Sequence, residues 1–247
     1  MDPIIPDLDK RTKEAIKQFW LGRKGQAEKQ KIAGKVQDAG TRSSVTGGNH
    51  MDGFVNLVAD SLLHVGLPKD CIVTKRRGVV IPGYYRPTKQ WDLLAIYNHN
   101  LLAAVEFKSQ VGSIGNNLNN RTEEALGNST DILKAYEKGL FLKSPQPWLG
   151  WMMVLGDSEV VNRPISARAD NFPVDPVFKS TSYSGRYQIL AKRMLHERHY
   201  SGACVILTPN GDGVSGAYKE PDNELTMRRF IGGLAGHVSG YLATLKK

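Results

Sequence analysis

Two carboxylates and one lysine lie in an otherwise apolar part of the sequence: Asp92, Glu106 and Lys108. Charged side chains are costly to bury without partners, so their presence in apolar segments needs a reason. Two neighbouring carboxylates repel each other unless a cation lies between them, and Mg²⁺ prefers such oxygen ligands. A bound Mg²⁺ can hold a phosphate, orient an attacking water and neutralise charge that develops during hydrolysis. The residue types therefore suit metal-assisted hydrolysis of a phosphate ester.

The segments around these residues predict a β-hairpin. Trp91 to Tyr97 and Leu101 to Phe107 are rich in strand-forming residues, and the Asn-His-Asn turn between them tolerates left-handed backbone. With the hairpin centred on His99, Asp92 lies seven residues before the centre and Glu106 seven after it. Opposed residues of an antiparallel pair share a face, with Cβ atoms about 5 Å apart. This register therefore predicts two adjacent carboxylates.

Further polar residues extend the same predicted face. Lys108 and Gln110 follow Glu106 at intervals of two, so a continuing strand places all three on one side of the sheet. A register slip of one residue would destroy this arrangement. The structural alternative is a plain ion pair between Lys108 and either carboxylate, because a Glu-x-Lys sequence arises by chance in many chains of this length.

The charge of the chain favours a polyanionic partner. Thirty-three basic and 24 acidic residues give a net charge of +9. The excess is +7 in residues 1–90 and +5 in residues 161–247, whereas residues 91–160 carry −3. An acidic centre between basic flanks suits a cation site with walls that bind phosphates. The alternative is a basic protein whose charge is merely uneven.

Composition excludes several classes of protein. Two cysteines without C-x-x-C spacing exclude a disulfide framework and a cysteine zinc site. The first residues have no apolar segment of the kind found in a secretory signal. The longest apolar run, Trp148 to Leu155, is too short to span a bilayer. We expect a cytoplasmic protein that does not interact with membranes.

Hydrophobic periodicity predicts the order of the remaining elements. A long exposed helix is expected over Asp9 to Lys35, and a strand pair precedes the hairpin. Further helices are predicted over Asp52–Val65, Thr122–Phe141, Ser184–His199 and Asp222–Leu245, the last capped by Asp222, and buried strands over Leu149–Leu155 and Ala203–Thr208. This order predicts an α/β fold of the α+β type, with a central mixed sheet flanked by helices.

The sequence also resembles a known family. Asp92, Glu106 and Lys108 resemble the PD-(D/E)xK nuclease pattern, although Pro87 is not adjacent to Asp92. The segment from Ala103 to Asp131, AAVEFKSQVGSIGNNLNNRTEEALGNSTD, is similar to the XhoI-like type II restriction endonucleases. Similarity continues through FPVDPVFKSTSYSGRYQIL and LHERHYSGAC and extends over nearly the whole chain.

This resemblance implies a homodimeric, Mg²⁺-dependent endonuclease with a restriction-endonuclease-like core. Its implied target is double-stranded DNA at the palindrome CTCGAG, cut to leave 5′ overhangs. Asp92 and Glu106 are the implied metal ligands, with the backbone carbonyl of Phe107 as the third, and Lys108 is the implied catalytic lysine. A separately encoded DNA methyltransferase would protect the host. One endonuclease domain is expected over 1–247, with a helical extension (1–50), a catalytic core (51–210) and a C-terminal helix (211–247).

Candidate DNA-binding residues lie in two segments. Asn can pair with adenine and Arg with guanine in the major groove. The first segment is a Gly/Asn-rich loop just beyond the catalytic strand, with Asn117, Asn120 and Arg121, and the second is an irregular basic stretch with Arg163, Arg168, Asn171, Lys179 and Arg186. A loop of this composition is also an ordinary turn, and most surface Arg and Lys side chains are simply solvated.

Two other functions remain open from the residues alone. A repair or structure-directed nuclease with the same core would bind DNA by shape and tolerate any sequence. A non-catalytic DNA-binding protein would use Asp92, Glu106 and Lys108 only as a structural ion-pair cluster. Loss of cutting with retained binding in a carboxylate variant would separate the nucleases from the non-catalytic protein.

Overall fold

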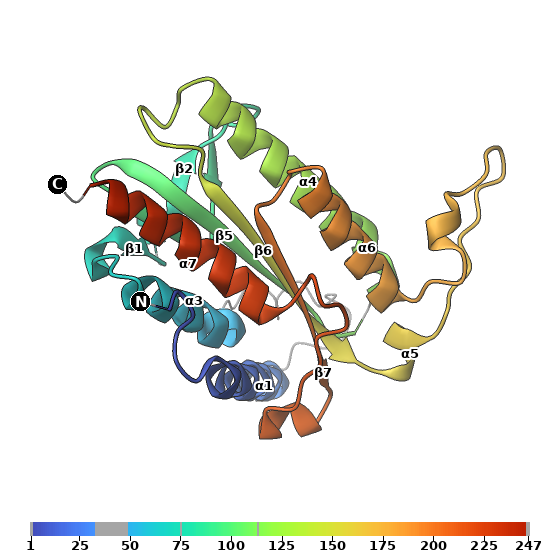
Figure 1. Ribbon diagram of the computed structural model, residues 1–247. Coiled ribbons are helices and arrows are strands. Elements are labelled where there is room, and N and C mark those ends of the chain that lie inside the picture. Colours follow the sequence, from blue (N-terminus) through green and yellow to red (C-terminus); the bar gives the residue numbers. More distant parts are fainter. Residues whose placement is uncertain (1, 33–48, 75, 113, 246–247) are drawn as a thin grey trace.

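A computed structural model describes residues 2–32, 49–74, 76–112 and 114–245 (Figure 1). Its centre is a five-stranded mixed sheet in the order β1-β4-β5-β6-β7, which confirms the predicted fold class. The strands are β1 (Ile72–Val73), β4 (Leu93–Tyr97), β5 (Asn100–Gln110), β6 (Trp148–Asp157) and β7 (Gly202–Pro209). β1, β4 and β5 pair antiparallel, whereas β5, β6 and β7 pair parallel. A separate antiparallel pair consists of β2 (Val80–Pro82) and β3 (Thr88–Gln90).

Helices cover both faces of the central sheet (Figure 1). One face packs against α1 (Leu8–Ile32), α3 (Asp52–His64) and α7 (Met227–Thr244). The other packs against α4 (Ile114–Glu137) and α6 (Tyr183–His196). Short elements connect them: α5 (Glu159–Asn162), η1 (Asn49–Met51), η2 (Lys69–Cys71), η3 (Arg76–Val79), η4 (Pro176–Phe178) and η5 (Asp212–Ser215). In the part of the chain that the structure describes, no helix has the length and apolar character to cross a membrane.

The parallel strands are apolar on both sides because helices cover both faces of the sheet. Nine of the ten residues of β6 are buried, and so are the first seven of the eight residues of β7. Burial on both faces explains why these strands appear in the sequence as continuous apolar runs rather than as alternating patterns. Between them, the two clusters of buried side chains form the core on either side of the sheet.

The β4–β5 hairpin has a two-residue turn rather than the predicted three-residue one. Asn98 and His99 both adopt positive φ, of 47° and 62°, as a tight hairpin turn requires. Next to this turn Ile96 pairs with Leu101. If that register continued, each residue of β4 would pair with the β5 residue one position before its predicted partner. Asp92 would then align with Val105 instead of Glu106.

A β-bulge restores the predicted register at the end of the hairpin that lies far from its turn. The register shifts between Ala95 and Ile96, so that Leu93 pairs with Val105. The extra residue lies in β5 at Leu102. Leu93 and Val105 thus pair in the register that the sequence predicted, and Asp92 lies one position before β4. The turn and the bulge thus compensate each other.

Helix α1 contradicts the expectation of an exposed helix. Ile16 and Phe19 are fully buried, and Ala15 and Trp20 also lie in the core. Charged residues dominate the composition of the helix, but its few apolar residues form one stripe against α3 and the sheet. The predicted end of this helix, at Lys35, lies outside the described residues.

Two other helix boundaries differ from the prediction. Helix α4 begins at Ile114 rather than at Thr122, so the expected Gly/Asn-rich loop is helical. Helix α7 begins after Thr226, whose side chain accepts the hydrogen bond of Arg229 N, and not at Asp222. Asp222 instead accepts a hydrogen bond from Glu224 N and pairs with Lys192 of α6.

Candidate active site

Asp92 lies just before β4, at the end of the hairpin far from its turn. Its backbone N donates at 3.3 Å to the carbonyl of Val105, the residue of β5 that pairs with Leu93. Its carboxylate oxygen Oδ2 accepts a hydrogen bond from Phe107 N at 2.8 Å. N–H and C=O of one strand residue point to the same side of the strand. The Phe107 carbonyl therefore also faces the side on which Asp92 lies.

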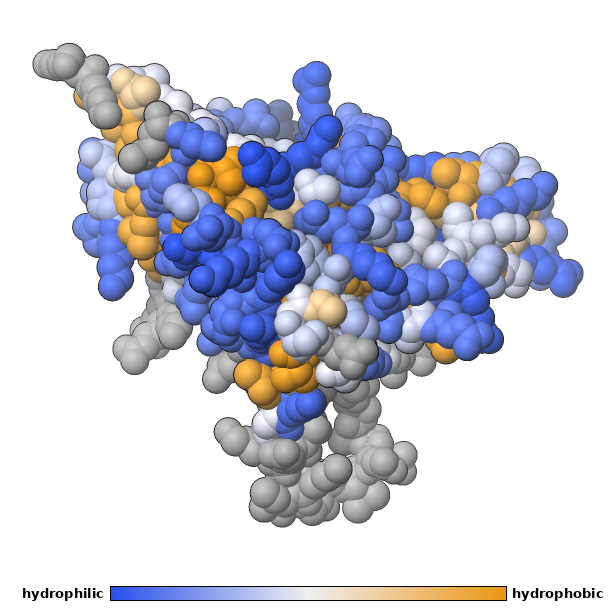
Figure 2. Space-filling view, turned by 60° about the horizontal axis from the view of Figure 1, so that its bottom comes forward, coloured by the Kyte–Doolittle hydropathy of each residue, from blue (hydrophilic) through white to orange (hydrophobic). Residues whose placement is uncertain are grey.

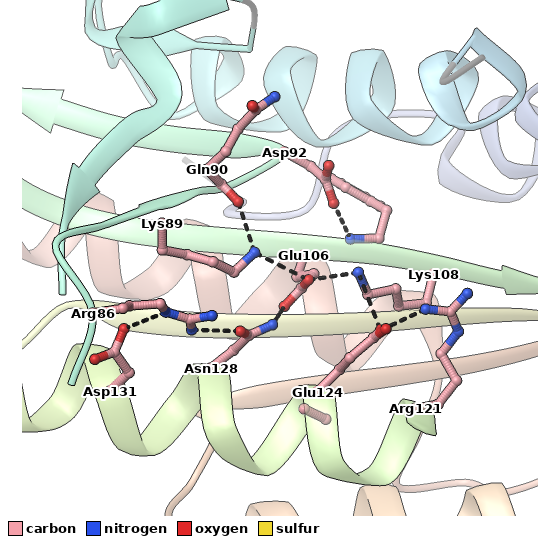
Figure 3. Close-up of polar contacts among 12 residues, drawn as sticks. Arg86, Lys89, Gln90, Asp92, Glu106, Lys108, Arg121, Glu124, Asn128 and Asp131 are labelled. Carbon is pink, nitrogen blue, oxygen red and sulfur yellow. Dashed lines mark hydrogen bonds and ion pairs between the residues drawn. The ribbon is translucent and has the colours of Figure 1, made fainter. Parts of the chain in front are cut away.

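Glu106 lies in the middle of β5, and its side chain is only 2% exposed. Oε1 accepts from Lys108 Nζ at 2.6 Å and from Lys89 Nζ at 3.3 Å. Oε2 accepts from Asn128 Nδ2 at 2.6 Å. Figure 3 shows Lys89 and Lys108 approaching the carboxylate from opposite sides, with Asn128 reaching it from α4. The buried charge of Glu106 is thus fully compensated by protein groups.

The two carboxylates have pKa values shifted in opposite directions. Burial raises the pKa of Asp92 above its ordinary value, since one hydrogen bond from Phe107 N and the more distant Lys108 only partly offset desolvation. Burial also acts to raise the pKa of Glu106, but the charges of Lys108 and Lys89 outweigh it and lower that pKa. Neighbouring carboxylates with opposite pKa shifts are frequent at functional sites.

An ion-pair chain extends from Lys108 along the first half of α4. Glu124 Oε2 lies 3.8 Å from Lys108 Nζ and 2.5 Å from Arg121 Nη1. Arg121 is half-buried, and its Nε has no hydrogen-bond partner. Arg121 therefore stays close to the lysine, with one buried donor left to offer.

A second chain of contacts ties the β2–β3 hairpin to Glu106. Asn128 Oδ1 accepts from Arg86 Nη2 at 2.7 Å, while its amide nitrogen donates to Glu106. Asp131 accepts from Arg86 Nε at 2.8 Å and from the backbone nitrogens of Tyr84 and Tyr85 at 2.8 Å each. The hairpin turn is therefore held against α4, which places the strand of Lys89 beside Glu106 (Figure 3).

A cleft of about 310 Å³ opens beside these residues. It is lined on one side by Asp92, Lys108 and Arg121, and on the other by residues of η1 and the start of α3, among them His50, Asp52 and Asn56. Glu106 is buried and does not line the cleft. The cleft gives an elongated anion access to the exposed ends of Asp92, Lys108 and Arg121.

The predicted donor set fits a hard divalent cation. Asp92, Glu106 and the Phe107 carbonyl offer oxygen atoms only, which suits Mg²⁺ better than a thiophilic metal. Among the residues that the structure describes, no three His, Cys, Asp or Glu side chains gather as a metal-binding cluster. The predicted set contains two carboxylates and a carbonyl and is smaller than such a cluster.

The predicted DNA-binding residues of the first segment lie on the first turns of α4. Asn120 is exposed and Asn117 is half-buried. Arg121, at the cleft, follows in the same helix. They do not form the loop that the sequence predicted, but they lie directly beyond the strand that carries Glu106 and Lys108.

The second segment forms an arm, residues 163–182, that projects from the body between α5 and α6 (Figure 1). Four of its predicted DNA-binding residues are exposed: Arg163, Arg168, Asn171 and Lys179. Arg186 differs, because its Nη2 donates to the carbonyls of Ile165 and Ser166 at 3.3 and 3.1 Å. Figure 2 shows a largely hydrophilic face with separate hydrophobic patches, and the arm, at the right, carries both.

Sequence reasoning missed several residues of the site. Lys89 lies in a short strand that was not predicted, and its contact with Glu106 depends on the hairpin's position. The α4 contacts had a detectable signal, because Glu124, Asn128 and Asp131 follow Arg121 at helical spacing. Placing the helix start at Thr122 separated Arg121 from this stripe.

Comparisons with known proteins agree with this geometry. The family model for restriction endonuclease XhoI matches residues 29–220. The type II restriction enzyme BstVI of Geobacillus stearothermophilus is 41% identical over 209 residues, which cover 82% of this chain and 93% of that protein. XhoI of Xanthomonas vasicola is 38% identical over 193 residues, or 77% of each chain. AbrI of Azospirillum brasilense is 45% identical over 170 residues, or 68% of this chain and 74% of that protein. No solved structure matches significantly.

Proposed function

Because this chain belongs to the XhoI family of restriction endonucleases, we propose that it cuts both strands of duplex DNA at CTCGAG, leaves 5′ overhangs and requires Mg²⁺. The type II restriction enzymes to which it is similar support a site-specific deoxyribonuclease. The observation that carries the proposal is the position of Asp92, Glu106 and Lys108 at one end of the β4–β5 hairpin, beside an open cleft.

In the proposed mechanism the protein supplies ligands, positive charge and orientation. Asp92, Glu106 and the Phe107 carbonyl would hold Mg²⁺, which supplies charge neutralisation and a more acidic water. The ammonium group of Lys108 contacts Glu106 Oε1 and would donate to a non-bridging oxygen of the scissile phosphate. Arg121 lines the cleft and would bind a neighbouring phosphate. Orientation and fixed charge of this kind account for most of the catalysis of phosphoryl transfer.

We propose that DNA is read from both predicted segments. Asn117, Asn120 and Arg121 extend along the helix that leaves the catalytic strand, so contacts here would lie close to the cut bond. In the arm, the exposed Arg163, Arg168, Asn171 and Lys179 are free to reach a groove or phosphates. Arg186 is bonded to carbonyls of the arm, so we propose that it acts by holding the arm in shape.

We also propose a homodimer acting in the cytoplasm. One site cuts one strand, and a two-fold axis on a palindrome presents the second strand to an identical site. Such an enzyme would endanger its own cell, so we infer that a separately encoded DNA methyltransferase modifies the same site in the host genome.

The proposal is tested with two plasmids, matched except for one CTCGAG site, each incubated with Mg²⁺ or with EDTA. We expect cutting only where both the site and Mg²⁺ are present, at one position in each strand with a 5′ overhang. Cutting of both plasmids would contradict sequence-specific cleavage and indicate a structure-directed nuclease instead. No cutting by protein that binds duplex DNA would favour the non-catalytic alternative.

A further inference from the structure

Lys89 is a second cation on Glu106, and it comes from outside the central sheet. It lies in β3, and its side chain is 17% exposed. Its Nζ is 3.3 Å from Glu106 Oε1 and donates to the carbonyl of Gln90 at 2.6 Å. It also lies 5.1 Å from the centre of the Trp91 ring, within the range of a cation–π contact. Lys89 thus has partners that do not depend on Glu106 (Figure 3).

The charges around Glu106 are balanced in the structure without a metal ion. Asp92 and Glu106 carry two negative charges, and Lys89 and Lys108 carry two positive ones. Beyond them, Arg121 is paired with Glu124 and Arg86 with Asp131. A divalent cation that binds Glu106 Oε1 would lie close to the ammonium groups of Lys89 and Lys108, because both contact that oxygen. Like charges at such distances repel strongly in a partly buried site.

Lys89 is better placed than Lys108 to yield to a metal ion. The Lys108 contact with Glu106 is shorter, 2.6 Å against 3.3 Å, and Lys108 belongs to the central strand β5. Lys89 belongs to the two-stranded β2–β3 sheet and keeps the Gln90 carbonyl and the Trp91 ring when it leaves the carboxylate. Glu106 Oε1 already accepts from both ammonium groups, so one of them must withdraw before a metal ion can bind that oxygen.

We propose that Lys89 is a positioning residue that occupies the metal's side of Glu106 in the DNA-free enzyme and leaves it when the metal and a phosphate bind. The inference rests on the proposed metal site at Asp92 and Glu106. Its consequence is weak metal binding in the absence of DNA, because the negative phosphate is needed to offset the added positive charge. Lys89 would thereby link occupation of the metal site to the presence of DNA.

The test is a titration of the whole DNA-free chain with Mn²⁺, in which calorimetry measures the affinity. Lys89→Met removes the ammonium group, and we expect it to bind Mn²⁺ at least about tenfold more tightly than the natural chain. Lys89→Arg keeps the charge and should stay within about twofold of the natural affinity. Lys134→Met is the matched control, because it removes a lysine paired with an exposed glutamate elsewhere on α4, and it should change nothing.

The outcomes separate this inference from the proposed function. A merely structural role of Lys89 would weaken Mn²⁺ binding in Lys89→Met, and that result, like an unchanged affinity, would overturn the inference. If Asp92→Asn abolishes Mn²⁺ binding in that case, the metal site itself stands. If Asp92→Asn leaves Mn²⁺ binding intact, the proposed metal site fails and Lys89 loses its role with it. Lys89→Gln gives the same comparison if Lys89→Met does not fold.

Discussion

The cluster around Glu106 and the projecting arm differ in how their charged side chains are held. In the cluster, every polar atom of Glu106 has a partner, and the partners come from β3, β5 and α4. In the arm, Arg168 is 87% exposed and pairs with the similarly exposed Asp170. The cluster is preorganised by packing, whereas the arm presents side chains that still have hydrogen-bonding capacity. Such a division suits chemistry at the first region and adaptable contacts with a long ligand at the second.

Of the substitutions in the two regions, Lys108→Ala should have the largest effect, a loss of DNA cleavage. We expect cleavage of a CTCGAG duplex to fall at least about a thousandfold, or ~4 kcal/mol in the barrier, because a preorganised charge at the phosphate is lost. Binding to the same duplex, measured in Ca²⁺ by gel shift, should change little. Full cutting activity in this variant would contradict the mechanism, and lost binding would give Lys108 a role in affinity instead.

Asp131→Ala tests whether the hairpin depends on its clamp. The change leaves two backbone nitrogens and Arg86 Nε without their acceptor, so we expect about 3 kcal/mol of lost stability in urea unfolding. Cleavage should fall as well, since Arg86 of the hairpin also holds Asn128, which donates to Glu106. Glu137→Ala, an exposed carboxylate on the same helix, is the control. Equal effects of the two variants would show that the clamp does not hold the hairpin.

His50 makes the cluster side of the molecule sensitive to pH. Burial, and after it the charge of Arg23, lower the pKa of His50 from 6.5 to about 4. The unfolded chain therefore takes up a proton at a higher pH than the folded one. The stability from neutral His50 is fully present above pH 6.5 and is lost as the pH falls toward 4.

Urea unfolding at pH 7 and pH 5 measures this effect. We expect the natural chain to lose about 2 kcal/mol between them through His50, and His50→Gln to lose correspondingly less. His196→Gln replaces an exposed histidine and should keep the pH dependence of the natural chain. The same pH dependence in all three proteins would rule out a neutral, buried His50.

Arg168→Ala, in the arm, should have the smallest effect of these substitutions. Stability should stay within about 0.5 kcal/mol, because an exposed ion pair contributes little. DNA affinity should fall about threefold to tenfold, with a salt dependence reduced by about one phosphate contact. Lys138→Ala, an exposed basic change outside the arm, should leave affinity unchanged. Equal losses in both variants would remove the arm from the DNA-binding surface.

The predicted hairpin register was confirmed through compensating details that the sequence did not reveal. Asn98 and His99 were correctly expected in a turn, but the turn is one residue shorter than predicted. The bulge at Leu102 shifts the register back, and no local feature of that residue type indicates a bulge. Alternation alone predicts the register of Leu93 with Val105 but not the backbone path that produces it.

The helix boundaries were less predictable because local signals compete with packing. The Gly/Asn-rich segment before Thr122 has low helix propensity, yet it is helical, with Ile114 and Leu118 packed in the core. In α1, too few apolar residues among many charges suggested exposure, although Ile16 and Phe19 are fully buried. In both cases burial of a few side chains outweighed the average composition.

The amino-acid sequence was sufficient to predict the mixed α/β class, the order of most elements and the closeness of Glu106 and Lys108 on β5. These features follow from periodicity and from the cost of placing charge in apolar strands, both of which are local. Packing of distant elements brings Lys89 and Arg86 to the site, and it brings the helical stripe of Asn128 and Asp131 into contact with them. Their contacts connect β3, β5 and α4 across 17 to 47 residues of chain. Such long-range contacts depend on how the elements pack, and no local pattern encodes that packing.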